Sequence, residues 1–259
     1  MKKNIVLLSL QLGLLTTFVS HAALAEDVKP DNETSFNLSL TSDYRYRGIS
    51  QTRLNPALQG GADYNNNPTG LYVGTWLSTI SWIKDTPGAG STPLEWDIYA
   101  GKKGEISKDV SYDVGMLGYV YLNNDLVKVG LKDANTLEIY GQLGYGPAYI
   151  KYSHALTPLF GIVDSSNSGY LDAGANIELT EGLILNLHAG YQKVKGANSS
   201  AATYADYKIG ISKEFKNLAG ATVSLAAIGT NADKSFYASP ANGKFMGKNS
   251  LVLAVSKTF

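Results

Sequence analysis

From residue 36 onward, the sequence consists of short segments in which apolar and polar residues alternate, separated by turn-forming stretches. Successive side chains of a β-strand point to opposite faces, so this alternation predicts strands with one apolar and one polar face. Most segments approach the roughly 9–11 residues that a tilted strand needs to cross a bilayer. We predict twelve strands: Phe36–Arg47, Ala57–Tyr64, Leu71–Trp82, Leu94–Lys103, Val110–Tyr121, Thr136–Leu143, Ala148–Ala155, Gly169–Leu179, Leu183–Lys193, Thr203–Glu214, Ala221–Thr230 and Ser250–Phe259.

The connections between these segments alternate strictly between long and short, starting with a long one. Transmembrane barrels have short periplasmic turns and longer external loops, whereas a sandwich gives no reason for such regularity. The sequence therefore predicts an all-β fold: a transmembrane antiparallel up-and-down β-barrel of about 12 strands, with short periplasmic turns and longer external loops. Barrels of ten or fourteen strands are the alternatives.

The N-terminus has the three parts of a secretory signal. Lys2 and Lys3 precede a mostly apolar stretch at residues 5–19, and a small-x-small site follows at residues 23–25. This pattern predicts a signal peptide at residues 1–25. We expect residues 26–259 to form a single outer-membrane β-barrel domain, in the outer membrane of a Gram-negative bacterium.

The last predicted strand ends in an aromatic residue. Leu251, Leu253, Val255 and Phe259 share one face of this strand, and a terminal aromatic suits the interfacial girdle of a membrane barrel. The ending resembles the C-terminal assembly signal of Gram-negative outer-membrane proteins, although Lys257 departs from the usual pattern. We therefore expect Phe259 to act as an assembly signal, with the outer-membrane assembly machinery, outer-membrane lipid and lipopolysaccharide as partners.

The composition excludes several classes of protein. The chain has no cysteine, so it holds neither a disulfide framework nor a thiolate metal site. Lys and Arg total 22, as do Asp and Glu, so no basic excess suggests binding to nucleic acid. Many glycines and tyrosines (27 and 17) with only 17% charged residues argue against an ordinary soluble enzyme. We predict no cofactor and no metal.

Three stretches carry a likeness to a known family: SDYRYRGISQ at residues 42–51, NPALQGGADY at 55–64 and GLYVGTW at 70–76. They resemble the TorF family of bacterial porins, whose function is otherwise unknown. The likeness is densest over residues 36–80. It implies an outer-membrane barrel and a porin, and it brings no catalytic residues with it.

The lumen of a barrel of this size is too wide to be filled by apolar packing, so its inner face is usually polar and wet. The sequence thus predicts a porin-like channel for passive diffusion of small hydrophilic solutes and ions. Acids outnumber bases on the predicted inner face, which favours cations. The predicted pore-lining residues are Asp43, Arg45, Arg47, Arg53, Asp63, Glu95, Asp97, Asp113, Glu138, Lys151, Asp172, Asp206 and Lys208.

Two roles are open for the arginines near the external end of the first strand. Arg45 and Arg47, together with Arg53, could select carboxylate or phosphate solutes. Alternatively, they could pair with Asp43 and Asp63 and brace the barrel wall.

The aromatic residues near the segment ends have a simple explanation as interfacial belts, and a carbohydrate-stacking surface is the alternative. They are Trp76, Trp82, Trp96, Tyr44, Tyr46, Tyr119, Tyr121, Tyr191 and Tyr207.

Two other functions compete with a channel. One is an outer-membrane enzyme that acts on lipid, although Ser153 and His154 point to opposite faces and no catalytic motif is present. The other is a plugged barrel with a structural or adhesive role, in which the loop Asn231–Asn249 could fold inward. Passage of sugars and amino acids through the protein would separate these functions.

Overall fold

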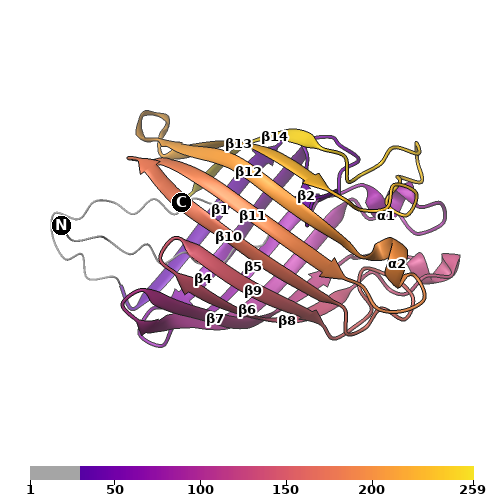
Figure 1. The fold of residues 1–259 in the computed structure, drawn as a ribbon, viewed down its shortest axis with the longest axis horizontal. Coiled ribbons are helices and arrows are strands. Elements are labelled where there is room, and N and C mark those ends of the chain that lie inside the picture. Colours follow the sequence, from indigo (N-terminus) through magenta and orange to yellow (C-terminus); the bar gives the residue numbers. More distant parts are fainter. Residues whose placement is uncertain (1–29) are drawn as a thin grey trace.

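The computed structural model describes residues 30–259, so the predicted signal peptide lies outside the described residues. Within them, twelve strands form a closed antiparallel barrel (Figure 1). Each strand pairs with its sequence neighbours, and the first pairs with the last. The strands are β1 (Asn32–Thr41), β4 (Ala57–Asn66), β5 (Leu71–Thr79), β6 (Leu94–Ser107), β7 (Val110–Val120), β8 (Thr136–Tyr145), β9 (Ala148–Ala155), β10 (Gly169–Thr180), β11 (Leu183–Lys193), β12 (Tyr204–Phe215), β13 (Ala221–Thr230) and β14 (Ser250–Thr258).

The predicted all-β barrel of twelve strands is confirmed, and β9, β11 and β13 begin and end at the predicted residues. The five short turns lie at one end of the barrel, together with the C-terminus (Figure 1). The long connections lie at the opposite end with the short helices α1 (Trp82–Asp85) and α2 (Ser199–Ala202). The 3-10 turns η1 (Leu126–Val129) and η2 (Lys216–Leu218) are equally short. No helix in residues 30–259 is long and apolar enough to cross a bilayer.

The outer face of the barrel is apolar, because the exposed residues of each strand are mostly aliphatic or aromatic. In β14, Leu251, Leu253 and Val255 are exposed and alternate with buried small residues. In β5, Leu71 and Leu77 face outward. Such an apolar surface is stable only against lipid, which is the arrangement of a transmembrane barrel.

The C-terminal residue closes the barrel through its backbone. The Phe36 amide donates to the Phe259 carbonyl at 3.1 Å, and the Phe259 amide donates to the Phe36 carbonyl at 2.8 Å. The Phe259 ring is exposed on the outer side. The ammonium of Lys257 lies 4.7 Å from the centre of this ring, so the residue that departs from the usual signature still packs on it.

The first strand ends earlier than predicted. We expected it to continue to Arg47, but β1 stops at Thr41, whose hydroxyl donates to the Asp43 carbonyl at 3.1 Å. The chain then forms a small hairpin from β2 (Arg45–Tyr46) and β3 (Ile49–Ser50). At its tip, Arg47 and Gly48 have φ angles of 46° and 77°. Two-residue hairpin turns of type I′ need positive φ at both central residues, and Gly48 supplies one of them without strain.

Glycines on the inner face make room for tyrosine rings of the adjacent strand. A Cβ atom added to Gly74 would overlap the ring of Tyr99, and one added to Gly190 would overlap Tyr170. Gly101, Gly115 and Gly174 are covered in the same way by Tyr72, Tyr140 and Tyr149. The high numbers of glycine and tyrosine in this chain therefore have one structural cause, the packing of tyrosine rings over glycines on the inner face.

Candidate functional site

The first external loop, residues 42–56, folds into the barrel and crosses its lumen. Its Tyr44 ring packs edge-on against Trp76 of β5, with ring centres 5.4 Å apart. The Tyr46 and Tyr119 hydroxyls lie 2.6 Å apart, which fastens the hairpin to β7. Burial raises the pKa of Tyr46, so its hydroxyl keeps its proton and acts as a hydrogen-bond donor or acceptor.

Arg47, at the tip of the hairpin, reaches the side of the barrel away from β1. Its guanidinium donates to the Glu138 carboxylate of β8 at 2.7 Å and to the Gln192 side-chain oxygen of β11 at 2.6 Å. It also lies over the ring of Tyr170 in β10, 4.2 Å from the ring centre. Burial acts to lower the pKa of Arg47, but the nearby Glu138 carboxylate raises it well above its ordinary value. The side chain therefore stays charged although it is only 7% exposed.

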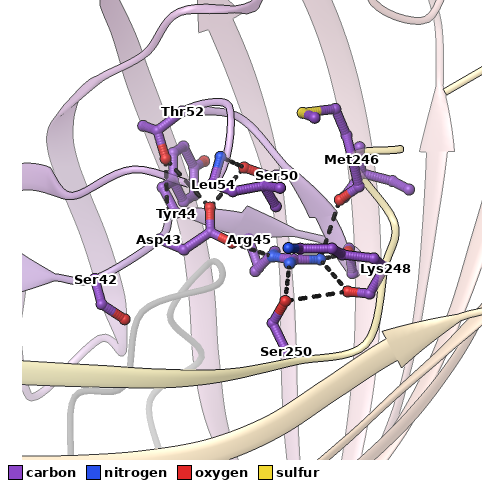
Figure 2. A network of polar contacts seen from close by, with 12 residues as sticks. Ser42, Asp43, Tyr44, Arg45, Ser50, Thr52, Leu54, Met246, Lys248 and Ser250 are labelled. Carbon is purple, nitrogen blue, oxygen red and sulfur yellow. Dashed lines mark hydrogen bonds and ion pairs between the residues drawn. The ribbon is translucent and has the colours of Figure 1, made fainter. Parts of the chain in front are cut away.

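Arg45 holds the base of the same loop against the last external loop. Figure 2 shows its guanidinium between Asp43 and the chain around Met246, Lys248 and Ser250. The distances are 2.5 Å to the Asp43 carboxylate and 2.8–3.1 Å to the acceptors in the last external loop and β14. All three nitrogens of Arg45 thus donate to protein atoms, an arrangement that favours the bracing role.

Asp43 is the second centre of this network. The Ser50 hydroxyl donates to its carboxylate at 2.5 Å and the Thr52 hydroxyl at 3.3 Å (Figure 2). Arg53, further along the loop, forms an ion pair with Asp85 of α1. The loop is therefore fixed at its start by the hydrogen bonds of Arg45, and at its tip and its end by ion pairs.

Apolar side chains fill the space around the loop at the external end. Tyr44 and Trp76 belong to a buried cluster that includes Ile80, Ile83 and Leu117. On the other side of the lumen, Ile49 packs with Tyr204, Ala232 and Met246. Apolar packing thus narrows the external half of the lumen on both sides of the loop.

Tyrosine hydroxyls hold most of the carboxylates of the inner wall. Each such hydroxyl is a neutral donor, so it satisfies the carboxylate while leaving its negative charge in the lumen. The pairs are Tyr99 with Asp63 (2.6 Å), Tyr72 with Asp113 (2.6 Å), Tyr149 with Asp172 (3.2 Å), Tyr170 with Asp206 (2.9 Å), Tyr119 with Glu138 (3.4 Å), and Tyr44 and Tyr121 with Glu95.

His188 lies on the same wall between two aspartates. Its Nδ1 is 2.8 Å from Asp172 and its Nε2 is 2.7 Å from Asp206. Lys208 is its cross-strand neighbour on β12. Because both ring nitrogens are bound to carboxylates, His188 has no free nitrogen with which to activate a nucleophile.

The predicted pore-lining residues fall into two groups. Nine lie on barrel strands, buried or half-buried in alternation with the exposed apolar residues: Asp63, Glu95, Asp97, Asp113, Glu138, Lys151, Asp172, Asp206 and Lys208. The other four, Asp43, Arg45, Arg47 and Arg53, lie in the first loop. Asp43, Arg45 and Arg47 were predicted in the first barrel strand, but that strand ends at Thr41; Arg45 lies in the short strand β2 of the loop hairpin and Arg47 at the hairpin tip. The bracing alternative paired these arginines with Asp43 and Asp63; Arg45 does bind Asp43, whereas Asp63 accepts a hydrogen bond from Tyr99.

The belt interpretation was wrong for several aromatic residues. Tyr44, Tyr119, Tyr121 and Trp76 are almost fully buried inside the barrel, whereas Tyr191 and Tyr207 are exposed on its outer face. The burial follows from the inward loop, which gives these rings a packing partner. Sequence reasoning also missed the lumenal role of Tyr72, Tyr99, Tyr140, Tyr149 and Tyr170. One signal was available, because Tyr99 alternates in phase with Glu95 and Asp97.

In the part of the chain that the structure describes, no group of three or more His, Cys, Asp or Glu side chains could hold a metal ion. Two lysines of the inner wall have neutral partners. The Lys151 ammonium lies 4.0 Å from the centre of the Tyr140 ring, and Lys103 donates to the Asn65 side chain at 2.8 Å.

The model of a family described as a bacterial protein of unknown function, Gcw_chp, matches residues 25–259. The chain belongs to the Gcw_chp family. We expected a family without an assigned function, and the match agrees with this. That the family is TorF remains a prediction. No curated protein matches the sequence.

Two porins of known structure share the fold of this Gcw_chp protein. KdgM porin aligns with a TM-score of 0.50 at 7% identity, over 87% of this chain and 98% of the porin. NanC porin aligns with a TM-score of 0.53 at 8% identity, over 87% of this chain and 98% of the porin. At such low identity the similarity is one of fold.

Proposed function

We propose that this protein is an outer-membrane channel for the passive diffusion of small hydrophilic solutes. The observation that carries the proposal is the combination of a closed barrel, an apolar outer face and an inner wall of charged side chains held by tyrosines. Buried charge is costly to maintain unless water or ions reach it. A wall of this kind is therefore expected to serve the passage of polar solutes.

The mixed charge of the lumen favours cations. Acids outnumber bases among the proposed pore-lining residues, and a tyrosine hydroxyl is a neutral donor that does not cancel the charge of the carboxylate it binds. The inward loop narrows the external half of the lumen, so we expect small solutes to pass and larger ones to be excluded.

The test is reconstitution of the protein into liposomes and planar bilayers. We expect swelling with monosaccharides and amino acids, weak swelling with oligosaccharides, and a reversal potential of the sign of a cation-selective pore under a KCl gradient. Impermeability to every solute would contradict the channel, and a clear anion preference would contradict the proposed selectivity.

A second candidate is a plugged barrel with a structural or adhesive role. The inward position of the first loop favours it. Arg47 of this loop binds β8 and β11, while Tyr44 and Tyr46 pack on the barrel interior. The same liposome experiment separates the two candidates, because a permanently plugged barrel passes neither ions nor sugars.

The remaining assignments belong to this proposal. We infer export by a cleaved signal peptide at residues 1–25 to the outer membrane of a Gram-negative bacterium. There, the barrel at residues 26–259 would contact lipid and lipopolysaccharide and be assembled through a signal that includes Phe259. The sequence's other alternative, an enzyme acting on lipid, would be revived by turnover of phospholipid in the same vesicles.

A further inference from the structure

One carboxylate of the inner wall differs from all the others described above. Asp97 of β6 is 0% exposed, and neither of its carboxylate oxygens has a hydrogen-bond partner among residues 30–259. Its cross-strand neighbour on β5, Trp76, is 4% exposed, and its indole N–H also has no partner in the described barrel and loops. Two buried carboxylate oxygens on β6 and one buried indole N–H on β5 thus lack hydrogen-bond partners.

Such an arrangement is unfavourable in either protonation state of Asp97. A buried carboxylate without a counter-charge is strongly destabilised, and a protonated carboxyl still has a hydroxyl and an oxygen that need partners. Native structures rarely leave buried polar atoms in this condition, and those that do call for an explanation such as a missing ligand.

The first loop packs on the two residues that flank Asp97 on the neighbouring strands. Tyr44 packs on Trp76, and Tyr46 packs on Tyr119 with ring centres 5.5 Å apart. Trp76 and Tyr119 are the two cross-strand neighbours of Asp97. Withdrawal of the loop would therefore take the Tyr44 ring from Trp76 and the Tyr46 ring from Tyr119, whose other ring contact, with Phe160, would remain.

The groups around Asp97 define the chemistry of a ligand. Glu95 lies two residues before Asp97 on the same face of β6, and Glu138 accepts a hydrogen bond from Tyr119, a cross-strand neighbour of Asp97. Only Glu138 has a basic partner, Arg47, which leaves with the loop. Carboxylates beside exposed aromatic rings attract an ammonium group, which donates hydrogen bonds to oxygen and is stabilised over ring faces. A hydroxyl on the same molecule could accept the N–H of Trp76.

We propose that Asp97 and Trp76 form a binding site for small ammonium-bearing, hydroxylated solutes, which is uncovered when residues 42–56 leave the lumen. A metal ion fits less well, because the described carboxylates do not converge into a metal-binding group. Since the ligand binds only the uncovered state, it favours withdrawal of the loop. The inference rests on the proposed channel function, because transported solutes are what would reach this site.

The test is titration calorimetry of the full protein in detergent with glucosamine hydrochloride, and with glucose as an uncharged molecule of the same shape. We expect the wild type to bind glucosamine in preference to glucose. Asp97→Asn should lower glucosamine affinity about tenfold or more through loss of a charge-assisted contact. Glu181→Gln, which removes a carboxylate from an exposed turn between β10 and β11, should bind like the wild type.

Trp76→Phe is the second variant, since it keeps a ring and removes only the N–H. Loss of one neutral hydrogen bond should lower glucosamine affinity roughly threefold. Equal binding by the wild type and both variants, or no preference for glucosamine over glucose, would overturn the site. Circular dichroism of each variant verifies folding.

Binding in detergent does not require transport, so the two proposals fail separately. A wild type that binds glucosamine but passes no solute in liposomes would refute the channel and retain the site. A wild type that passes solutes without binding glucosamine would retain the channel and refute the site.

Discussion

Replacement of Arg47 by alanine should open the external half of the lumen. Arg47 is the residue of the first loop that is bound to the wall away from β1, through Glu138 and Gln192. Without it, residues 42–56 keep their attachments near β14 and α1 and the Tyr46 contact with Tyr119, but lose the bonds that hold the hairpin tip to β8 and β11. The loop should then withdraw more often.

The size of the effect follows from the burial of the ion pair, whose side chains are 7% and 2% exposed. Removal of one partner of a buried pair costs about 3–5 kcal/mol, largely because the other charge is left uncompensated. That penalty falls on the closed state, in which Glu138 is dry, and not on the open state, in which water reaches it. The ratio of open to closed loops should therefore rise roughly one hundred-fold to several thousand-fold.

The assay is single-channel recording in planar bilayers with KCl. We expect Arg47→Ala to show a higher conductance, or a longer dwell in the most conductive level, than the wild type. The matched control is Lys244→Ala, which removes a positive charge from an exposed position in the last external loop. The double variant Arg47→Ala with Glu138→Gln should recover thermal stability and show a smaller rise in conductance than Arg47→Ala, because no charge is then left uncompensated in the closed state.

If Arg47→Ala has the conductance and open fraction of the wild type but a lower melting temperature, Arg47 does not hold the loop closed. Arg47 would then stabilise a barrel whose passage lies elsewhere or does not exist.

Three further outcomes are expected. Tyr99→Phe should lower the free energy of unfolding by about 1–3 kcal/mol, because Asp63 loses its donor, and urea unfolding in lipid vesicles measures this. Ile209→Arg, on the exposed outer face of β12, should lower it by about 2–4 kcal/mol in the same assay, and no loss would argue against contact with the bilayer core. Phe259→Ala should slow assembly in cells yet change the stability of the folded barrel by only about 0.5 kcal/mol, since its backbone bonds to Phe36 remain. An assembly rate equal to that of the wild type would remove the proposed role of its ring.

The strands were predictable because lipid imposes a simple rule. Outward residues such as Leu251 and Leu253 must be apolar, and side chains alternate along a strand, so period and face can be found in a single sequence. The ends of β11 and β13 followed from this rule and from turn-forming residues beside them.

The inward loop was not predictable by the same rule. Residues 42–47 continue the alternation of β1, because Asp43, Arg45 and Arg47 remain in phase with the polar face. The chain leaves the sheet because these side chains find partners such as Glu138, which is distant in sequence. Gly48 was a local sign of the turn, but the contacts that hold the loop are long-range and carry no sequence period.

The glycines beneath the tyrosines set the bore of the barrel. Because Gly74 has no side chain, the Tyr99 ring lies flat on the wall and its hydroxyl still reaches Asp63. A methyl group at residue 74 would lift the ring toward the axis and narrow the passage by part of a ring's thickness. Among relatives, a larger residue at position 74 should therefore accompany a smaller residue at position 99. The two positions should covary, so that the width of the lumen is conserved.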